Sequence, residues 1–516
     1  MAASFAIHNE AWTARSFLGM IKQLTSSLLS PSTPSRSHEA HDLATFAEGK
    51  IVSPFWQARG FVILALIAAF SITTILVSSV FTSTPAAAQT GDATLEDLEK
   101  LGKQIFSDTN LSVNKNMSCA TCHSVPSGGT AASDLSNRTL GLHPGSTFQS
   151  YDKDPSALNA IAFRNIQTNG YAAYSPPLHR ELNPDGSITM IGGNFWDGRA
   201  TGFFTGRPTQ EQAMVPFLGS LEMALPAPAC VVNRVISNDF QRRHPISYQA
   251  VFGDKVNQIR WPANIAELCS KIDQVIDVGS DQDDAAVERA CSNIANALWK
   301  VQCSVEIVPF SSKFDRVAAG TAQLSPSEQR GLNLFNGKAK CSGCHVTSTS
   351  RGLSRPLFTD FSYDNLGVPR NPQNPVYRFA MINPDGNNWT DQGLGAILRH
   401  DDKLRSQADA NIGKFKVPTL RNVARQPSAD FVRSYMHNGY FRSLEQVVDF
   451  YNSRDVKPRC NNRFTDVNTA QQLGCWPEPE VSQNLNKTEL GNLGLTKQDQ
   501  TDLVAFMKTL TDAETR

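Results

Sequence analysis

The sequence lacks an excess of charge of either sign, because its 48 lysine and arginine residues equal its 48 aspartate and glutamate residues. Proteins that bind nucleic acid attract it with a field of positive charge, and no such field is predicted here. We therefore expect no nucleic-acid partner. The chain of 516 residues is long enough for two or three domains of about 100–200 residues each, so its function must be sought in local motifs.

One long stretch lacks charge altogether: residues 61–81 contain no charged side chain over 21 residues. About 20 such residues cross a bilayer as a helix. Residues 85–89, Pro-Ala-Ala-Ala-Gln, follow as a small-residue site for a signal peptidase. Because the 60 residues before the run are long for a cleaved signal, we favour an uncleaved membrane anchor, with cleavage as the alternative.

This reading divides the N-terminal part of the chain. Residues 1–60 are a cytoplasmic segment or an extended signal n-region, and residues 61–88 are the transmembrane anchor or signal segment. The remainder is expected to be exported to the periplasm or an equivalent lumen.

Two clusters of the form C-x-x-C-H are present, at residues 119–123 and 341–345. A zinc site needs four ligands, and no second C-x-x-C pair lies near either cluster to complete one. The α/β pattern around the motif of a thiol oxidoreductase is also absent. C-x-x-C-H is the sequence form of c-type haem attachment, in which two thioethers hold the porphyrin and the histidine binds the iron. We therefore predict two covalently bound haems c, attached through Cys119, Cys122, His123, Cys341, Cys344 and His345.

The cysteines outside the two clusters number six. They are Cys230, Cys269, Cys291, Cys303, Cys460 and Cys475. An even number in an oxidising compartment predicts three disulfides. Cys460 and Cys475 bracket one polar loop and are expected to pair, whereas the other four allow three connectivities.

A short helix of one design is predicted before each cluster. Thr94 with Asp97 and Ser325 with Glu328 have the spacing of capping boxes that open amphipathic runs. Both runs then contain Gly-x-x-[Ile/Leu]-Phe, starting at Gly102 in the first and at Gly331 in the second. The chain therefore contains an internal repeat at the scale of a domain.

Each half also ends on an apolar-periodic helix, with Ile294, Leu298 and Val301 in the first. Leu503, Phe506, Met507 and Leu510 belong to the second, after a cap at Thr496. The predicted fold class is mainly α, with two cytochrome-c-like haem domains in tandem after the N-terminal segment. The domains are residues 94–303 and 325–516, joined by a linker at 304–324. Stretches rich in proline, glycine and asparagine at 168–194 and 366–392 are expected to be loops with short hairpins.

The chemistry of each haem depends on the group opposite its histidine. Methionines are candidate ligands, although a methionine on a helix is more often part of a core. The candidate histidines are His143, His179, His244, His400 and His437.

Several ordered motifs make residues 94–516 resemble the bacterial di-haem cytochrome c peroxidases, including their MauG branch. They are CATCH (119–123), FRN (163–165), GNFWDGR (193–199), EQA (211–213), LEM (221–223), CSGCH (341–345), FKVPTLRN (415–422) and YMHNG (435–439). The resemblance implies that the first, peroxidatic haem reacts with peroxide and that the second stores and relays electrons.

The resemblance also implies roles for single residues. Met436 would be the sixth ligand of the second haem iron, with His437 as the local rival. The MauG branch has a tyrosine at this point, so the methionine favours a peroxidase that draws electrons from a small carrier. Trp196 resembles the tryptophan between the haems, and its alternative role is an aromatic that fills the domain interface.

Glu222 is the predicted catalytic base. Splitting peroxide requires a group that takes the proton from one oxygen and returns it to the other. Its alternative role is a solvated surface charge, but Glu222 lies in the apolar stretch 216–226, where burial would raise its pKa. Gln212 is expected to hydrogen-bond peroxide and orient it.

A calcium site and a capping ligand are the remaining implications. Asn165, with the backbone carbonyls of Lys416 and Pro418, resembles the family's calcium site, and oxygen ligands suit this cation. Many members carry a histidine that caps the first iron, but residue 157 is alanine here and only His143 lies nearby. Residues 171–187 look inserted, and 228–303 look enlarged.

The predicted function is a di-haem peroxidase that reduces hydrogen peroxide to water with electrons from a cytochrome c or a cupredoxin. A MauG-like enzyme that oxidises residues of a partner protein is one alternative. A non-enzymatic di-haem electron-transfer protein is the other. The sequence is compatible with a homodimer as well as a monomer.

Overall fold

The computed structural model describes residues 93–131, 163–219, 222–271, 274–349, 353–378 and 383–513. The predicted anchor at 61–81 and the segment before it lie outside these ranges, as do His143 and Ala157. Within the described ranges, no helix combines the length and apolar character needed to cross a membrane.

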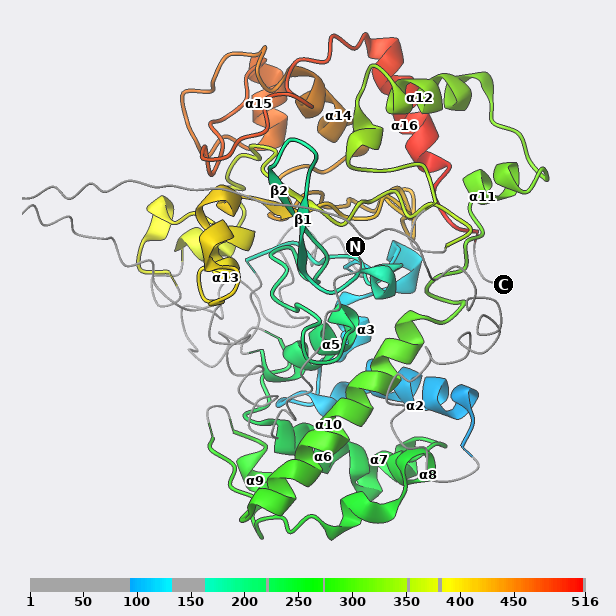
Figure 1. The fold of residues 1–516 in the computed structure, drawn as a ribbon, viewed down its shortest axis with the longest axis vertical. Helices are drawn as coiled ribbons and strands as arrows, with labels where there is room; N and C mark the ends of the chain where they lie inside the picture. Colours follow the sequence, from blue (N-terminus) through cyan, green and yellow to red (C-terminus); the bar gives the residue numbers. More distant parts are fainter. Residues whose placement is uncertain are drawn as a thin grey trace, which may run out of the picture. The chain divides into compact units, whose positions relative to one another are not determined.

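The first half of the described chain is a group of helices around one apolar core (Figure 1). The helices are α2 (Leu95–Ser107), α3 (Cys119–Cys122), α5 (Pro208–Leu218), α6 (Pro228–Ile236), α7 (Asn238–Arg243), α8 (Tyr248–Phe252), α9 (Ile265–Leu268) and α10 (Asp281–Gln302). The long helix α10 packs against α2, α5 and α6. Ile294, Leu298 and Val301 are buried on α10, as their spacing predicts.

The second half has its own apolar core around α16. Its helices are α11 (Lys313–Ala318), α12 (Pro326–Asn336), α13 (Leu394–Leu398), α14 (Leu444–Ser453), α15 (Val467–Leu473) and α16 (Lys497–Lys508). Both α12 and α14 pack against α16, which buries Leu503, Phe506 and Met507. Leu510 follows the helix and is buried as well. Helix α11 lies within the segment 304–324 that we predicted as a linker.

The predicted helix starts are confirmed. The side chains of Thr94, Ser325 and Thr496 each accept a hydrogen bond from the backbone three residues later, and each position forms a full capping box. These bonds satisfy backbone N–H groups that a helix leaves without partners.

In each half, the helix that precedes the C-x-x-C-H motif crosses the last helix at a glycine. A Cβ atom on Gly102 of α2 would lie 2.2 Å from the carbonyl oxygen of Ala297 on α10. A Cβ atom on Gly331 of α12 would lie 2.0 Å from the carbonyl oxygen of Asp502 on α16. No larger side chain fits such an approach without a shift of the helices. The repeated Gly-x-x-[Ile/Leu]-Phe motif therefore marks the same helix crossing in both halves.

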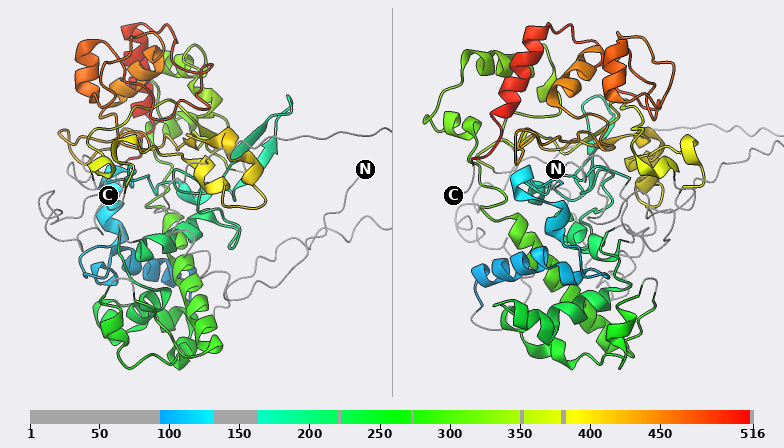
Figure 2. Two further views of the ribbon diagram at one scale, coloured as in Figure 1. Left: turned by 90° about the vertical axis from the view of Figure 1, so that its left-hand side faces the viewer. Right: turned by 180° about the vertical axis from the view of Figure 1, so that it is seen from behind.

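Two small antiparallel sheets complete the regular structure. Strands β1 (His179–Leu182) and β2 (Ile188–Ile191) form a hairpin in which His179 pairs with Ile191. Strands β3 (Tyr363–Asp364) and β4 (Phe415–Lys416) pair in the second half. The hairpin predicted within 168–194 is therefore present, with β1 exposed along its length (Figure 2). Among the described residues of 366–392 there is no strand.

Short 3-10 helices connect these elements. They are Thr109–Leu111, Val125–Ser127, Ala172–Tyr174, Asp254–Gln258, Cys341–Gly343, Pro375–Arg378, Gly386–Asn388, Arg405–Gln407 and Asp409–Asn411.

The disulfides only partly follow the prediction. Cys460 pairs with Cys475 as expected, and Cys230 pairs with Cys269. The third disulfide was wrongly predicted, because Cys291 and Cys303 are free thiols. Cys291 lies within α10 and Cys303 caps its C-terminus. Twelve residues of helix separate them by roughly 18 Å, far beyond the ~7 Å that a disulfide can bridge.

Candidate functional site

The first candidate site is a cavity with a volume of about 1090 Å³, including the part open to solvent. Cys122 and His123 lie on its wall, and Cys119 is the first residue of the same short helix, α3. Glu222, Gln212 and Trp196 line the same cavity. The structure thus brings together residues that the sequence spreads over about one hundred positions.

The second candidate site is a larger cavity of about 1460 Å³, again including the part open to solvent. Cys341, Cys344 and His345 lie on its wall. Met436 and His437, the two candidate ligands for the second iron, also line it.

Both attachment histidines are oriented by a backbone carbonyl. Nδ1 of His123 donates to the carbonyl oxygen of Gly129 at 2.9 Å, and Nδ1 of His345 donates to that of Phe358 at 2.9 Å. A carbonyl only accepts, so Nδ1 carries the proton and Nε2 is left as the metal-binding atom. Burial lowers the pKa of both histidines, which favours the neutral form that binds iron.

The four cluster cysteines fit covalent haem. None of them is in a disulfide. Burial raises the pKa of Cys119, Cys122 and Cys341 to about 12 and raises that of Cys344 as well. Such thiols are poor thiolate nucleophiles or zinc ligands on their own. With two thiols and an oriented imidazole at each large cavity, the donor set matches c-type haem attachment.

Glu222 and Gln212 carry no hydrogen bond to any other described residue through their side chains. Burial raises the pKa of Glu222, and the charge of Arg199 lowers it. A Cβ atom on Gly219 would lie 2.4 Å from Oε2 of Glu222. Glycine at 219, where α5 ends, therefore leaves room for this carboxyl group.

Met436 has a backbone φ of 68°, which is unusual for a residue other than glycine. The neighbouring His437 ring stacks on Phe415 at 3.5 Å between centroids. Nε2 of His437 lies 3.8 Å from Oε2 of Glu480 and makes no hydrogen bond within the described chain. The choice between Met436 and His437 as ligand stays a prediction.

Trp196 lines both cavities. Its Nε1 donates to the carbonyl oxygen of Asn165 at 2.8 Å, and its own carbonyl oxygen accepts from the backbone N–H of Lys416 at 2.9 Å. The indole therefore lies where the first and second halves meet.

A buried ion-pair network beside Trp196 was not predicted from the sequence. Arg164 lines the first cavity and Asp391 lines the second. Arg164 donates to Asp391 at 2.6 and 2.7 Å and also to Asp197. Burial opposes ionisation of Asp197, but Arg164 and Arg199 hold its pKa below the usual range. No local motif signals this network, because Arg164 and Asp391 are 227 positions apart.

The residues of the predicted calcium site lie near the same contact. Nδ2 of Asn165 donates to the carbonyl oxygens of Ser434 and Met436 at 3.0 and 3.1 Å. The Lys416 ammonium donates to Ser175 and to the carbonyls of residues 192 and 193. Calcium binding by Asn165 and the carbonyls of Lys416 and Pro418 stays a prediction.

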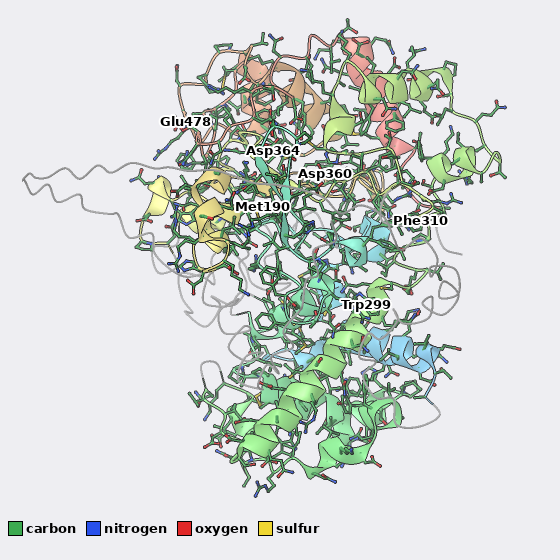
Figure 3. The ribbon with its side chains drawn as sticks, viewed as in Figure 1. Met190, Trp299, Phe310, Asp360, Asp364 and Glu478 are labelled. Carbon is green, nitrogen blue, oxygen red and sulfur yellow. A yellow bond between two sulfur atoms is a disulfide. The ribbon has the colours of Figure 1, made fainter. Side chains whose placement is uncertain are left out.

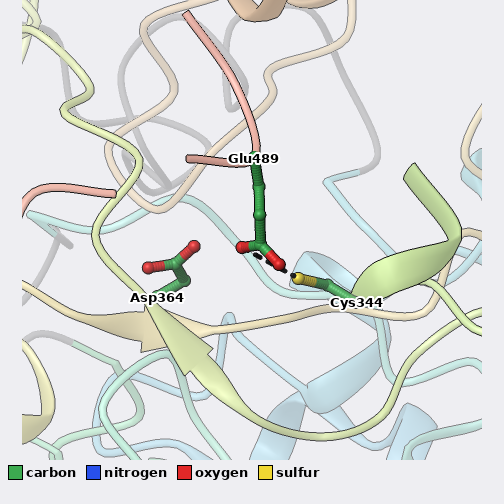
Figure 4. Close-up of side chains that lie close together, drawn as sticks. All are labelled: Cys344, Asp364 and Glu489. Atoms are coloured by element: carbon green, nitrogen blue, oxygen red, sulfur yellow. Dashed lines mark hydrogen bonds between the residues drawn. The ribbon is translucent and has the colours of Figure 1, made fainter. Parts of the chain in front are cut away.

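One cluster of metal-ligand residue types occurs in the described chain, formed by Cys344, Asp364 and Glu489 (Figure 4). Nδ2 of Asn486 donates to both carboxylates at 2.5 Å. Because Cys344 belongs to the haem-attachment motif, we do not assign a separate metal to this cluster.

Three other candidate histidines are described by the structure, and all three lie outside both cavities. Nδ1 of His179 bonds to the carbonyl oxygen of Pro177 at 2.8 Å on the exposed hairpin. Nε2 of His244 lies 3.1 Å from Asp108, and His400 is exposed. His143 lies outside the described residues.

Sequence reasoning missed several polar residues of the first cavity, among them Arg199 and Gln302. Arg199 is part of the GNFWDGR motif, so its position in that motif was an available signal. Gln302 is the last residue of α10 and is 4% exposed. A single glutamine on an apolar helix carries no signal of its own.

Comparison with known proteins agrees with this geometry. The family model described as "Di-haem cytochrome c peroxidase" matches residues 96–323. The methylamine utilization protein MauG of Paracoccus denitrificans is 33% identical over 432 residues, covering 83% of this chain and 92% of MauG. A cytochrome-c peroxidase of Denitromonas iodatirespirans is 26% identical over 433 residues, covering 81% of this chain and 82% of that protein.

A solved structure shares the fold. It is a tyrosine-to-methionine variant of the di-haem peroxidase BthA from Burkholderia thailandensis, with a TM-score of 0.58 and 27% identity. The match covers 83% of this chain and 88% of that one.

Two cavities, each with a C-x-x-C-H motif and an oriented histidine, define a protein with two c-type haem sites. The chain belongs to the di-haem cytochrome c peroxidase family, which includes MauG and the cytochrome-c peroxidases.

Proposed function

We propose that the protein is a peroxidase that reduces hydrogen peroxide to water with electrons from a small redox carrier. The observation that carries the proposal is the first cavity, where Glu222 and Gln212 line the same space as His123 and make no hydrogen bond to other described side chains. Polar groups without partners in a cavity are suited to a small polar substrate. The haems, when bound, supply electron storage and an iron at which peroxide is split.

Six residues would hold the two haems. They are Cys119, Cys122 and His123 for the first, and Cys341, Cys344 and His345 for the second. Met436 would be the sixth ligand of the second iron, because it lines the second cavity in the YMHNG motif, and His437 is its rival.

Glu222 would act as the proton carrier. Its carboxylate accepts a proton from one oxygen of peroxide and returns it to the oxygen that leaves as water. Two electrons from the carrier and two protons from solvent complete the conversion of one peroxide to two waters. Gln212 would hydrogen-bond peroxide through its side-chain amide and so orient one peroxide oxygen towards the Glu222 carboxylate.

Trp196 would connect the two sites. It is the one described residue that lines both cavities, and its backbone and ring bond to Lys416 and Asn165. Electrons that enter at the second site would pass this residue to reach the first.

Several further properties belong to the same proposal. The exported part would lie in the periplasm or an equivalent lumen, anchored by residues 61–81, and a cytochrome c or cupredoxin would donate the electrons. A bound calcium at Asn165 would fasten residues 94–303 to 325–516, the two proposed haem domains. The protein could work as a homodimer.

The test is Glu222→Gln, which keeps the size of the side chain and removes the base. We expect peroxide turnover to fall by about 10²–10⁴-fold, while the haem absorption spectrum is unchanged. Glu267→Gln is the matched control, because Glu267 is exposed on α9 and forms an ion pair with Lys271. Full activity in Glu222→Gln would remove this residue from the mechanism.

A MauG-like activity on a partner protein is the second candidate. The identity of 33% to a MauG protein over 92% of its length favours it. Such an enzyme would form a long-lived oxidised state with peroxide and turn over small donors poorly. Stopped-flow absorption after one equivalent of peroxide, with and without a reduced cytochrome c, separates the two activities.

The non-enzymatic alternative makes a different prediction. A pure electron-transfer protein would have both irons fully ligated, so cyanide would change neither haem spectrum. Cyanide binding to one haem of the half-reduced protein is expected from the proposed peroxidase.

A further inference from the structure

A buried arginine lies in the first cavity with Glu222. Arg199 is 8% exposed and lines the same cavity as Glu222 and Gln212. Its Nη1 donates to both carboxylate oxygens of Asp197, at 3.0 and 3.1 Å. Its Nε is buried and has no hydrogen-bond partner among the described residues. The described residues therefore anchor the guanidinium to Asp197 through Nη1 and leave its Nε without a hydrogen-bond partner.

The loop at residues 193–199 holds this guanidinium in place. The Cζ atom of Arg199 lies 3.5 Å from the centre of the Phe195 ring, a cation–π contact. Phe195 has a φ of 64°, and such a conformation costs a residue other than glycine about 1–3 kcal/mol. Strain of this kind persists where the surrounding structure requires it. The loop is thus shaped to put an aromatic ring beneath Arg199.

The other charges near Arg199 balance one another. Asp197 is shared by Arg199 and Arg164, and Arg164 also pairs with Asp391. Two cations therefore face two anions, and an ionised Glu222 would add one further negative charge.

Arg199 lines the first cavity together with Glu222. Burial raises the pKa of the Glu222 carboxyl, and the positive charge of Arg199 offsets part of that rise. The charge of Glu222 also raises the pKa of the Cys119 and Cys122 thiols. These sulfur atoms carry no charge once they are thioethers. Arg199 therefore opposes the effect of burial on Glu222.

We propose that Arg199 is a positioning residue of the peroxide site, whose guanidinium stabilises the negative charge of the Glu222 carboxylate in the cavity that both residues line. The inference rests on the proposed role of Glu222. A buried carboxyl without a nearby cation stays protonated at higher pH, and a protonated carboxyl cannot take a proton from peroxide. Arg199 itself exchanges no proton, because a guanidinium stays charged.

The test measures the protonation of Glu222 directly. Infrared difference spectra of the ferric holoprotein, recorded against pH, contain a carboxyl band of Glu222 that is identified by its loss in Glu222→Gln. In Arg199→Gln we expect the midpoint of this band to rise by about one pH unit or more, which is a tenfold change in proton affinity. The acid limb of the pH profile of kcat/KM for peroxide should move in the same direction.

Two further variants complete the design. Arg207→Gln is the matched control, because Arg207 also stacks on an aromatic ring but does not line either cavity. Its Cζ atom lies 3.9 Å from the centre of the ring of Trp299 on α10 (Figure 3). Arg207→Gln should leave the midpoint unchanged. Arg199→Met is a second neutral substitution of similar length, and the midpoint of Glu222 should rise in it as in Arg199→Gln. This variant tests the inference if Arg199→Gln fails to fold.

The outcomes separate this inference from the proposed function. An unchanged midpoint in folded Arg199→Gln or Arg199→Met would overturn the role of Arg199. Full peroxide turnover in Glu222→Gln would overturn the proposed function, even with a shifted midpoint in Arg199→Gln.

Discussion

At the scale of single residues, Met436 combines a position on the wall of the second cavity with an unusual backbone. Its φ of 68° lies in the left-handed region, which costs an ordinary residue roughly 1–2 kcal/mol. The carbonyl oxygen of Met436 accepts a hydrogen bond from Asn165, and that of His437 accepts one from the Asn165 backbone N–H. These bonds from the first half hold the strained segment in place.

Replacement of this methionine tests the ligand assignment. Axial ligands set haem potentials over a range of about 0.8 V, so Met436→Leu should lower one of the two potentials by on the order of 0.1 V. A potentiometric titration followed by haem absorption measures this shift. Met190→Leu is the control, because Met190 is buried outside both cavities (Figure 3). Two unchanged potentials in Met436→Leu would favour His437 as the ligand.

At the scale of helices, the two halves share one packing arrangement. The helix before each C-x-x-C-H motif crosses the last helix of its half at a glycine: Gly102 of α2 packs against α10, and Gly331 of α12 packs against α16. The close approach places the attachment motif against the core of its half, since α2 contacts α3 and α12 contacts the turn at residues 341–343. The repeat in the sequence is therefore a repeat of haem-supporting architecture.

The glycines at these crossings should not tolerate a methyl group. Gly102→Ala and Gly331→Ala place a Cβ atom within about 2 Å of a carbonyl oxygen, and overpacking of this kind costs about 1–3 kcal/mol. Chemical denaturation followed by far-UV circular dichroism measures the loss in the free energy of unfolding. Lys100→Ala on the exposed face of α2 is the control, with an expected change within ~0.5 kcal/mol. If all three variants had the same free energy of unfolding, the helices would be able to move apart without loss of stability.

At the scale of the whole chain, buried ion pairs and hydrogen bonds join segments that are far apart. Asp512 accepts from Tyr171 and Asn422 at 2.8 Å and from the backbone of Ser311 at 2.9 Å. Arg421 donates to Asp315 at 2.8 and 3.1 Å. The first half, the connecting segment and the second half therefore share buried polar contacts.

These contacts predict a dependence of stability on pH. Burial alone would raise the pKa of Asp315, but Arg421 and Ser312 hold it below the usual value. A carboxyl with a lower pKa in the folded state contributes stability above its unfolded pKa of about 4, and that stability is lost as pH falls through the folded pKa. Asp315→Asn should be less stable at pH 7 and lose less stability on acidification. Thermal unfolding of both proteins from pH 7 to pH 3 measures this difference, and parallel curves would contradict it.

Several features followed from the sequence because they depend on neighbouring residues. The capping boxes at Thr94, Ser325 and Thr496 need only a side chain and the backbone three residues on. The haem-attachment motifs likewise place two thiols and an imidazole by local spacing, and Cys460 and Cys475 are close along the chain.

Other features were decided by tertiary structure alone. The expected third disulfide is absent because Cys291 and Cys303 lie far apart along one helix, α10. The even number of cysteines in the sequence says nothing about this distance. The pairing of Arg164 with Asp391 joins positions 227 residues apart. The sequence by itself therefore determined which cofactor the chain binds, because the five adjacent residues of each C-x-x-C-H motif specify covalent attachment of haem. The charges around each cavity were decided only when distant segments packed together, because electrostatic effects depend on distance and burial in the folded chain.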